Sequence, residues 1–144
     1  MRKLFYVLGL LAAMSLTAFS SGSNEQKPIE SLPQEMQEFA YDLRSMIIYK
    51  LDSKETRFKD IVVDGNNLVC RFIFNEEETG ISLKEGFNRN MTEEDIRDEF
   101  IRRINKKCES TKEALRTYKY NVVARFTGSK SKHVRDVKIS YKEF

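Results

Sequence analysis

The chain has 144 residues, with 25 basic and 22 acidic side chains, one histidine, two cysteines and a formal net charge of +3. This length suits one domain with a single apolar core that does not depend on many disulfides. A charge this close to zero excludes nucleic acid as an expected partner, and a single histidine excludes a metal site built on two histidines.

The first twenty residues have the layout of an export signal. Arg2 and Lys3 precede an apolar run over residues 4–16, and small residues follow that suit a cleavage site. The run is shorter than the ~20 residues that cross a bilayer, so no transmembrane span is expected once the signal is removed. We therefore predict a signal peptide over residues 1–20 and a periplasmic or extracellular location.

The rest of the chain is predicted to hold one domain. Residues 21–31 are mostly polar and are expected to form a flexible leader, and residues 32–144 carry the apolar patterns of a folded unit. From Met36 to Ile47 apolar residues recur at steps of three and four, which predicts an amphipathic helix.

Two strand patterns follow this helix. Residues 58–63 and 68–74 are rich in β-branched and aromatic residues, and the Asp-Gly-Asn-Asn run between them predicts a tight turn, so they should form a hairpin. On the second strand Leu68, Cys70, Phe72 and Phe74 share the expected core face. Residues 75–90 are acidic at first, contain two glycines and show no period, so a long loop is expected there.

The C-terminal third repeats the order of helix and hairpin. Thr92 is the expected N-cap of a helix that reaches about Cys108, and the run over residues 110–113 matches a capping box that starts a short helix ending near Tyr118. Residues 120–126 and 134–141 alternate and predict a second hairpin. The α-β-β-α-β-β order predicts an α+β domain with a four-stranded, mainly antiparallel sheet and helices on one face.

The two cysteines leave two readings open. Cys70 falls on the core face of a strand and Cys108 on the apolar face of a helix, and a pair in an exported protein invites a disulfide. The alternative is two separate buried thiols, because a bridge needs Cα atoms within about 7 Å. Neither cysteine belongs to a Cys-x-x-Cys pair, so redox catalysis is not expected.

Charge is distributed unevenly along the chain. Residues 21–100 carry 18 acidic and 10 basic side chains, whereas residues 101–144 carry 13 basic and 4 acidic ones. A basic patch that binds an envelope protein or an anionic surface is therefore one hypothesis, and a solvated outer sheet face is the alternative. The patch would consist of Arg125, Lys130, Lys132, Arg135 and Lys138.

No run of residues predicts catalysis or a cofactor. Glu76, Glu77 and Glu78 form the densest carboxylate cluster, but adjacent glutamates commonly solvate a turn. The Gly-Ser-Lys-Ser-Lys-His run over residues 128–133 lacks the spacing of a phosphate-binding loop and is expected to join two strands. His133 has no expected catalytic partner. No catalytic residue, metal ligand or cofactor site is therefore assigned, and the protein is not predicted to be an enzyme.

Several short runs carry a resemblance to known proteins. They are Lys107-Cys108-Glu109-Ser110, Leu115-Arg116, Tyr118-Lys119-Tyr120 and Val137-Lys138-Ile139-Ser140. Together they resemble small exported proteins of Gram-negative, Bacteroides-like bacteria, in which a helical cysteine segment precedes a closing hairpin. The resemblance spans residues 33–144 and implies export but no particular activity.

Two functions remain in competition at this point. The first is a non-enzymatic interaction domain of the periplasm or cell exterior that recognises another protein through a sheet face or edge. The second is a carrier of a small ligand or lipid, whose apolar pocket beneath the helices would be lined by residues such as Phe72, Phe74 and Phe100. The presence or absence of a cavity at these side chains discriminates between the two.

Overall fold

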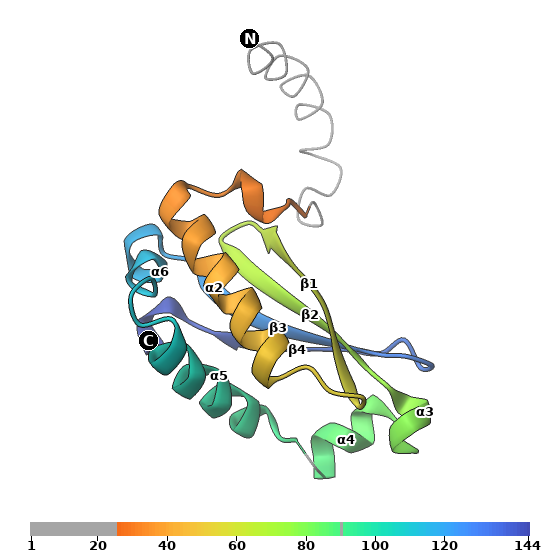
Figure 1. Ribbon diagram of the computed structural model, residues 1–144. Helices are drawn as coiled ribbons and strands as arrows, with labels where there is room; N and C mark the ends of the chain where they lie inside the picture. The colour runs from red at the N-terminus through yellow and green to blue at the C-terminus, as the bar shows by residue number, and fades with distance from the viewer. Residues whose placement is uncertain (1–25, 90) are drawn as a thin grey trace, which may run out of the picture.

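The structure is a computed structural model that describes residues 26–89 and 91–144, and it contains one four-stranded sheet (Figure 1). The strands β1 (Thr56–Asp64), β2 (Asn67–Phe74), β3 (Asn121–Gly128) and β4 (Val134–Ile139) lie side by side in chain order. β1 with β2 and β3 with β4 form antiparallel hairpins, whereas β2 and β3 run parallel. The predicted α+β class is confirmed. The sheet is mixed because a helical crossover joins the two hairpins.

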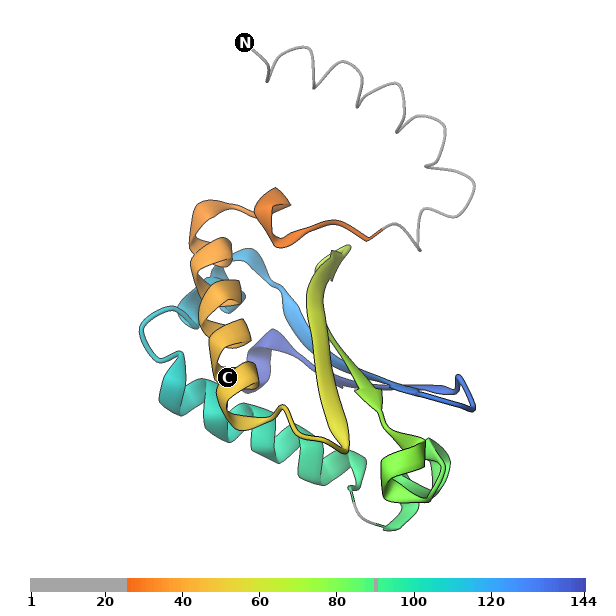
Figure 2. The ribbon, with the colours of Figure 1, turned by 45° about the vertical axis from the view of Figure 1, so that its right-hand side comes forward.

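Three helices cover one face of the sheet (Figure 2). They are α2 (Gln34–Lys50), α5 (Glu93–Lys107) and the short α6 (Glu113–Tyr118). The side chain of Thr92 caps α5 as expected, and the acidic first turn and basic last turn of that helix match its macrodipole. No helix of the described residues lies against the other face, which we call the open face.

The core lies between the helices and the covered face. Along β2 the even-numbered residues from Leu68 to Phe74 are buried, as the alternation predicted. The parallel register places Cys70 beside Ala124 and Phe72 beside Phe126, so β3 continues the same apolar layer. The apolar stripe of α2 is buried over this layer and consists of Met36, Phe39, Ala40, Leu43, Met46 and Ile47.

The expected long loop over residues 75–90 is wrong. It contains two short helices, α3 (Glu76–Thr79) and α4 (Leu83–Arg89), and the carboxamide of Asn75 caps α3 by accepting hydrogen bonds from two backbone N–H groups. Leu83 and Phe87, one turn apart on α4, are buried. Helices this short present only one or two apolar residues, which is too few for a periodic signal.

The packed domain begins before residue 32, unlike the expected flexible leader. Lys27 and Val63 exchange two backbone hydrogen bonds, of 2.8 and 2.7 Å, which adds a short bridge beside β1. Ile29, in the 3₁₀ turn η2 (Ile29–Ser31), is only 4% exposed. The predicted signal peptide and residues 21–25 lie outside the described residues. Within the described part, no helix is both long and apolar enough to cross a membrane.

The capping box expected over residues 110–113 does not form. α6 begins at Glu113 after Lys112, which offers no side-chain cap. The hydroxyl of Thr111 instead donates a 2.8 Å hydrogen bond to the carboxylate of Asp42 on α2. The short helix is present where the sequence predicts it. Thr111, however, does not cap this helix but links the α5–α6 turn to α2.

Candidate functional site

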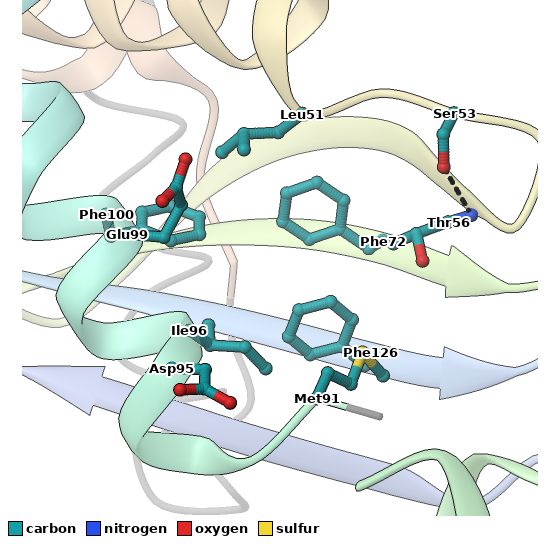
Figure 3. A pocket seen from close by; sticks show the side chains of 10 residues that line it. All are labelled: Leu51, Ser53, Thr56, Phe72, Met91, Asp95, Ile96, Glu99, Phe100 and Phe126. Carbon is teal, nitrogen blue, oxygen red and sulfur yellow. Dashed lines mark hydrogen bonds between the residues drawn. The ribbon is translucent and has the colours of Figure 1, made fainter. Parts of the chain in front are cut away.

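A cavity of about 360 Å³ opens between the C-terminal end of α2, the first turns of α5 and the covered face of the sheet (Figure 3). Its size falls within the range of about 300–1,000 Å³ that is typical of small-molecule sites. Ten side chains line it: Leu51, Ser53, Thr56, Phe72, Met91, Asp95, Ile96, Glu99, Phe100 and Phe126. This cavity is the first part of the candidate site.

The floor of the cavity is aromatic. Phe72 and Phe126 are register partners on the parallel pair β2–β3, and their rings stack with centroids 5.1 Å apart and an interplanar angle of 14°. Phe100, on α5, meets Phe72 edge to face at 6.3 Å. Figure 3 shows these rings beneath Leu51 and beside Ile96. Two strands and one helix therefore build one apolar surface at the base of the opening.

The rim of the cavity carries two carboxylates, Asp95 and Glu99, one turn apart on α5 (Figure 3). Burial raises the pKa of Glu99, but hydrogen bonds and ion pairs from Arg102 and Arg103 hold that pKa below its ordinary value, so the group is ionised at neutral pH. The carboxylate of Asp95 makes no hydrogen bond or ion pair with another described residue.

A second cavity of about 540 Å³ adjoins the first and shares Thr56 and Met91 with it. Its other lining residues are Glu55, Phe74, Glu78, Thr79, Ile81 and Gly86. Gly86 permits the close approach of α4, because a Cβ there would lie 3.0 Å from the ring of Phe74. We call the two cavities together the aromatic groove.

The sequence predicted part of this lining. Phe72 and Phe100 line the first cavity and Phe74 the second, as the carrier hypothesis expects. Phe126 and Met91 were missed. Phe126 shows the right alternation for the core face, but only the parallel pairing of the two hairpins places its ring beside Phe72.

A polar site separate from the aromatic groove lies where α3 meets the β3–β4 loop. The carboxylate of Glu76 accepts hydrogen bonds from the backbone N–H groups of Lys130 and Ser131 and from the Ser131 hydroxyl, each at 2.7 Å. It also accepts one from the backbone N–H of Leu83 at 2.8 Å. A Cβ at Gly128 would lie 2.5 Å from Glu76 Oε2, so this position requires glycine.

These hydrogen bonds fix the ionisation of Glu76. Burial raises its pKa, but the four donors more than compensate and lower it to about 2. An acid this strong stays ionised at neutral pH and is poorly suited to proton transfer. The 128–133 run, which lacks the spacing of a phosphate-binding loop, does hold an anion, and that anion is the chain's own carboxylate.

The basic residues of the predicted patch do not share one surface. Arg125 and Lys138 lie on the open face, where Arg125 forms a two-pronged ion pair with Asp136 at 2.8 and 3.0 Å. Lys130 and Lys132 are exposed in the β3–β4 loop. Arg135 lies on the opposite face of the sheet from Arg125 and Lys138, because odd-numbered positions on β4 face the helices.

The guanidinium of Arg135 already has two partners. It lies 4.5 Å from the ring centroid of Phe87 and 3.7 Å from a carboxylate oxygen of Glu93. Arg125 and Arg135 therefore both form salt bridges within the protein, and Arg135 also contacts an aromatic ring. His133 is exposed next to this strand, and the described residues contain no cluster of three or more side chains that could hold a metal ion.

Both cysteines are free thiols, so the disulfide that the sequence left open is not formed. Cys70 lies in the middle of β2, and burial raises its pKa far above the ordinary value. Cys108 follows the last turn of α5, and burial together with the charge of Asp42 raises its pKa to about 12. Each behaves as a small buried hydrophobe.

Alkylation followed by mass spectrometry tests this assignment. When the purified protein is unfolded without reductant, we expect both cysteines to be labelled, and prior reduction should leave the unfolding temperature unchanged. In the folded protein both thiols should react slowly, because burial disfavours the thiolate that attacks the reagent. Labelling of neither cysteine until reductant is added would show a bridge instead.

Comparison with known proteins identifies no family. No family model matches the chain, and no curated protein matches it. Among solved structures, one from Pseudomonas aeruginosa, named as a candidate secreted protein, is similar with a TM-score of 0.49 and 9% sequence identity, over 78% of this chain and 97% of that one. A likeness at this level carries no conclusion about the present chain.

Proposed function

We propose that this is an exported domain that binds a small, largely apolar ligand in the aromatic groove. The observation that carries the proposal is a cavity of about 360 Å³ whose floor consists of Phe72, Phe100 and Phe126 and whose rim is polar. An apolar pocket with a few convergent polar groups is the common form of a small-molecule site. The pattern of Arg2, Lys3 and the following apolar run supports export.

The groove supports ligand binding better than the basic segment supports protein binding. Arg125 and Arg135 already have acidic partners, and they point to opposite faces of β4 and its neighbour β3. Binding an acidic partner there would exchange existing ion pairs for new ones, which yields little net free energy at an exposed site. The Phe-lined cavity, in contrast, offers apolar surface from which a ligand displaces water.

Binding of the neutral fluorophore N-phenyl-1-naphthylamine tests the proposal. We expect saturable binding by the domain, and we expect Thr56→Trp to weaken it by at least about tenfold, because the indole fills the space between the two cavities. Arg57→Trp is the matched control. It is the next residue on β1 and pairs with Ile73 on the open face, so this variant should bind as the parent does.

A second blocking variant keeps the test valid if Thr56→Trp does not fold. Met91→Trp also places an indole between the cavities, from the segment that precedes α5. Circular dichroism should show that the variants keep the parent's secondary structure. The proposal fails if the parent shows no saturable binding, or if both blocking variants fold and bind as tightly as Arg57→Trp.

A further inference from the structure

We infer that the ligand of the aromatic groove is a cationic amphiphile, with an alkyl-substituted ammonium head and an apolar chain. This inference deepens the proposed function and rests on it. Among the described residues that line the two cavities there are four carboxylates and no lysine, arginine or histidine. The carboxylates are Glu55, Glu78, Asp95 and Glu99. Charge complementarity therefore favours a cation and disfavours a fatty acid or a phosphate.

Three of these carboxylates have no partner within the described part of the protein. The side chains of Glu55, Glu78 and Asp95 make no hydrogen bond or ion pair there, whereas Glu99 pairs with Arg102 and Arg103. The unpaired groups come from three different segments: the α2–β1 loop, α3 and α5. Glu78 and Asp95 lie in the first turns of two different helices and Glu55 lies in a loop, so the feature that all three share is the groove that they border.

The floor of the groove favours the same charge. Aromatic rings attract cations through their quadrupole, and a substituted ammonium is the cation that such rings bind most readily, because its alkyl groups are easily desolvated. Phe72, Phe100 and Phe126 lie in one cavity with Asp95 at its rim (Figure 3). The exposed part of these rings is small, 2–4% of each residue, and it lies in the same cavity as the Asp95 carboxylate.

The neutral polar side chains of the groove are three hydroxyls, of Ser53, Thr56 and Thr79, and two of these already take part in hydrogen bonds. The hydroxyl of Ser53 accepts a hydrogen bond from the backbone N–H of Thr56 at 3.1 Å, and that of Thr79 donates to the carbonyl of Asn75 at 3.0 Å. The lining therefore offers few free groups for an uncharged polar head such as a sugar. The second cavity, which continues the groove past Thr56, carries Glu55 and Glu78 beside Phe74 and Ile81, so both halves of the groove combine apolar side chains with carboxylates.

Competition with the bound fluorophore tests the inference. Three amphiphiles with the same ten-carbon chain are compared below their micelle concentrations: decyltrimethylammonium, decanol and decyl sulfate. We expect decyltrimethylammonium to displace the fluorophore at a concentration at least about tenfold lower than decyl sulfate, with decanol between them. Added salt should reduce this difference, because the rim carboxylates are partly exposed to solvent.

Charge-matched variants assign the preference to the groove. The triple variant Glu55→Gln, Glu78→Gln, Asp95→Asn removes the three unpaired rim carboxylates and should bring the three amphiphiles to within about threefold of one another. The control replaces the same number of charges on α3 and α5, outside the lining, and should keep the parent's preference. It consists of Glu77→Gln, Glu94→Gln and Asp98→Asn.

The outcomes separate the two proposals. If the fluorophore binds but decyl sulfate competes as well as decyltrimethylammonium, the cationic ligand is excluded and a groove for apolar ligands remains. The same holds if the two triple variants lose the preference equally, because the effect then reflects overall charge. If the fluorophore does not bind at all, the proposed function itself fails.

Discussion

Replacing Glu76 with glutamine should destabilise the protein by about 2–4 kcal/mol at neutral pH. The carboxylate accepts hydrogen bonds from three backbone N–H groups and one hydroxyl, and its side chain is buried. A glutamine has one acceptor oxygen, and its amide NH₂ would face N–H donors that it cannot satisfy. Urea unfolding followed by circular dichroism measures the change.

The pH dependence of stability should report the same group. The pKa of Glu76 is about 2 in the folded protein, against 4.5 as the ordinary value. Because the folded pKa is the lower one, the carboxylate contributes stability above the unfolded pKa and loses that contribution as the pH falls from about 5 to about 2. The difference in unfolding free energy between the parent and Glu76→Gln should therefore shrink over this interval.

Glu77→Gln is the matched control for both measurements. Glu77 is the next residue on α3, is exposed, and uses only its backbone N–H in the capping interaction with Asn75. Its replacement should change stability by less than about 0.5 kcal/mol, as is usual for exposed positions. Equal stabilities of Glu76→Gln and Glu77→Gln would show that the hydrogen bonds from the β3–β4 loop contribute nothing.

Replacing Cys108 with aspartate should be the most damaging single change, with a loss of more than about 3 kcal/mol. The side chain is fully buried, and the charge of Asp42 lies close enough to raise the pKa of the thiol. A carboxylate here would be desolvated beside a like charge. Since a small domain has only about 5–15 kcal/mol of stability, this loss removes a large share of it, and we expect the variant to unfold at a clearly lower temperature than the parent.

Cys108→Ala separates charge from volume. Alanine removes one sulfur atom and leaves the site apolar, so the loss should stay near 1 kcal/mol. Thermal unfolding of both variants under reducing conditions gives the comparison. A Cys108→Asp variant as stable as Cys108→Ala would mean that this position is not buried and that the register of α5 against the sheet differs from the one described.

The sequence predicted the elements that have a repeating pattern. The stripe from Met36 to Ile47 and the cap at Thr92 identified α2 and the start of α5, since an amphipathic helix of four turns repeats its apolar spacing often enough to be recognised. The alternation on β2 also identified its core face. Residues 75–90 were mistaken for a loop, because α3 and α4 are too short to show a period and part of what stabilises them, such as the hydrogen bonds from the β3–β4 loop to Glu76, comes from outside the segment.

Glu76 illustrates this difference most clearly. In the sequence it is one of three adjacent glutamates, and nothing local distinguishes it from Glu77 or Glu78. Its partners, Lys130 and Ser131, are more than fifty residues away. Only the fold brings their backbone N–H groups to it, and backbone groups carry no sequence signal.

The composition of the groove likewise depends on tertiary structure. The apolar faces containing Phe72, Phe100 and Phe126 follow from local periodicity, because side-chain direction along a strand or helix is set by backbone geometry. That two of these rings stack depends on the parallel pairing of β2 with β3, which joins residues 54 positions apart. That carboxylates of three segments border the two adjoining cavities depends on how α3 and α5 meet the sheet. The sequence alone thus determined which side chains face inward, whereas long-range packing determined which of them meet.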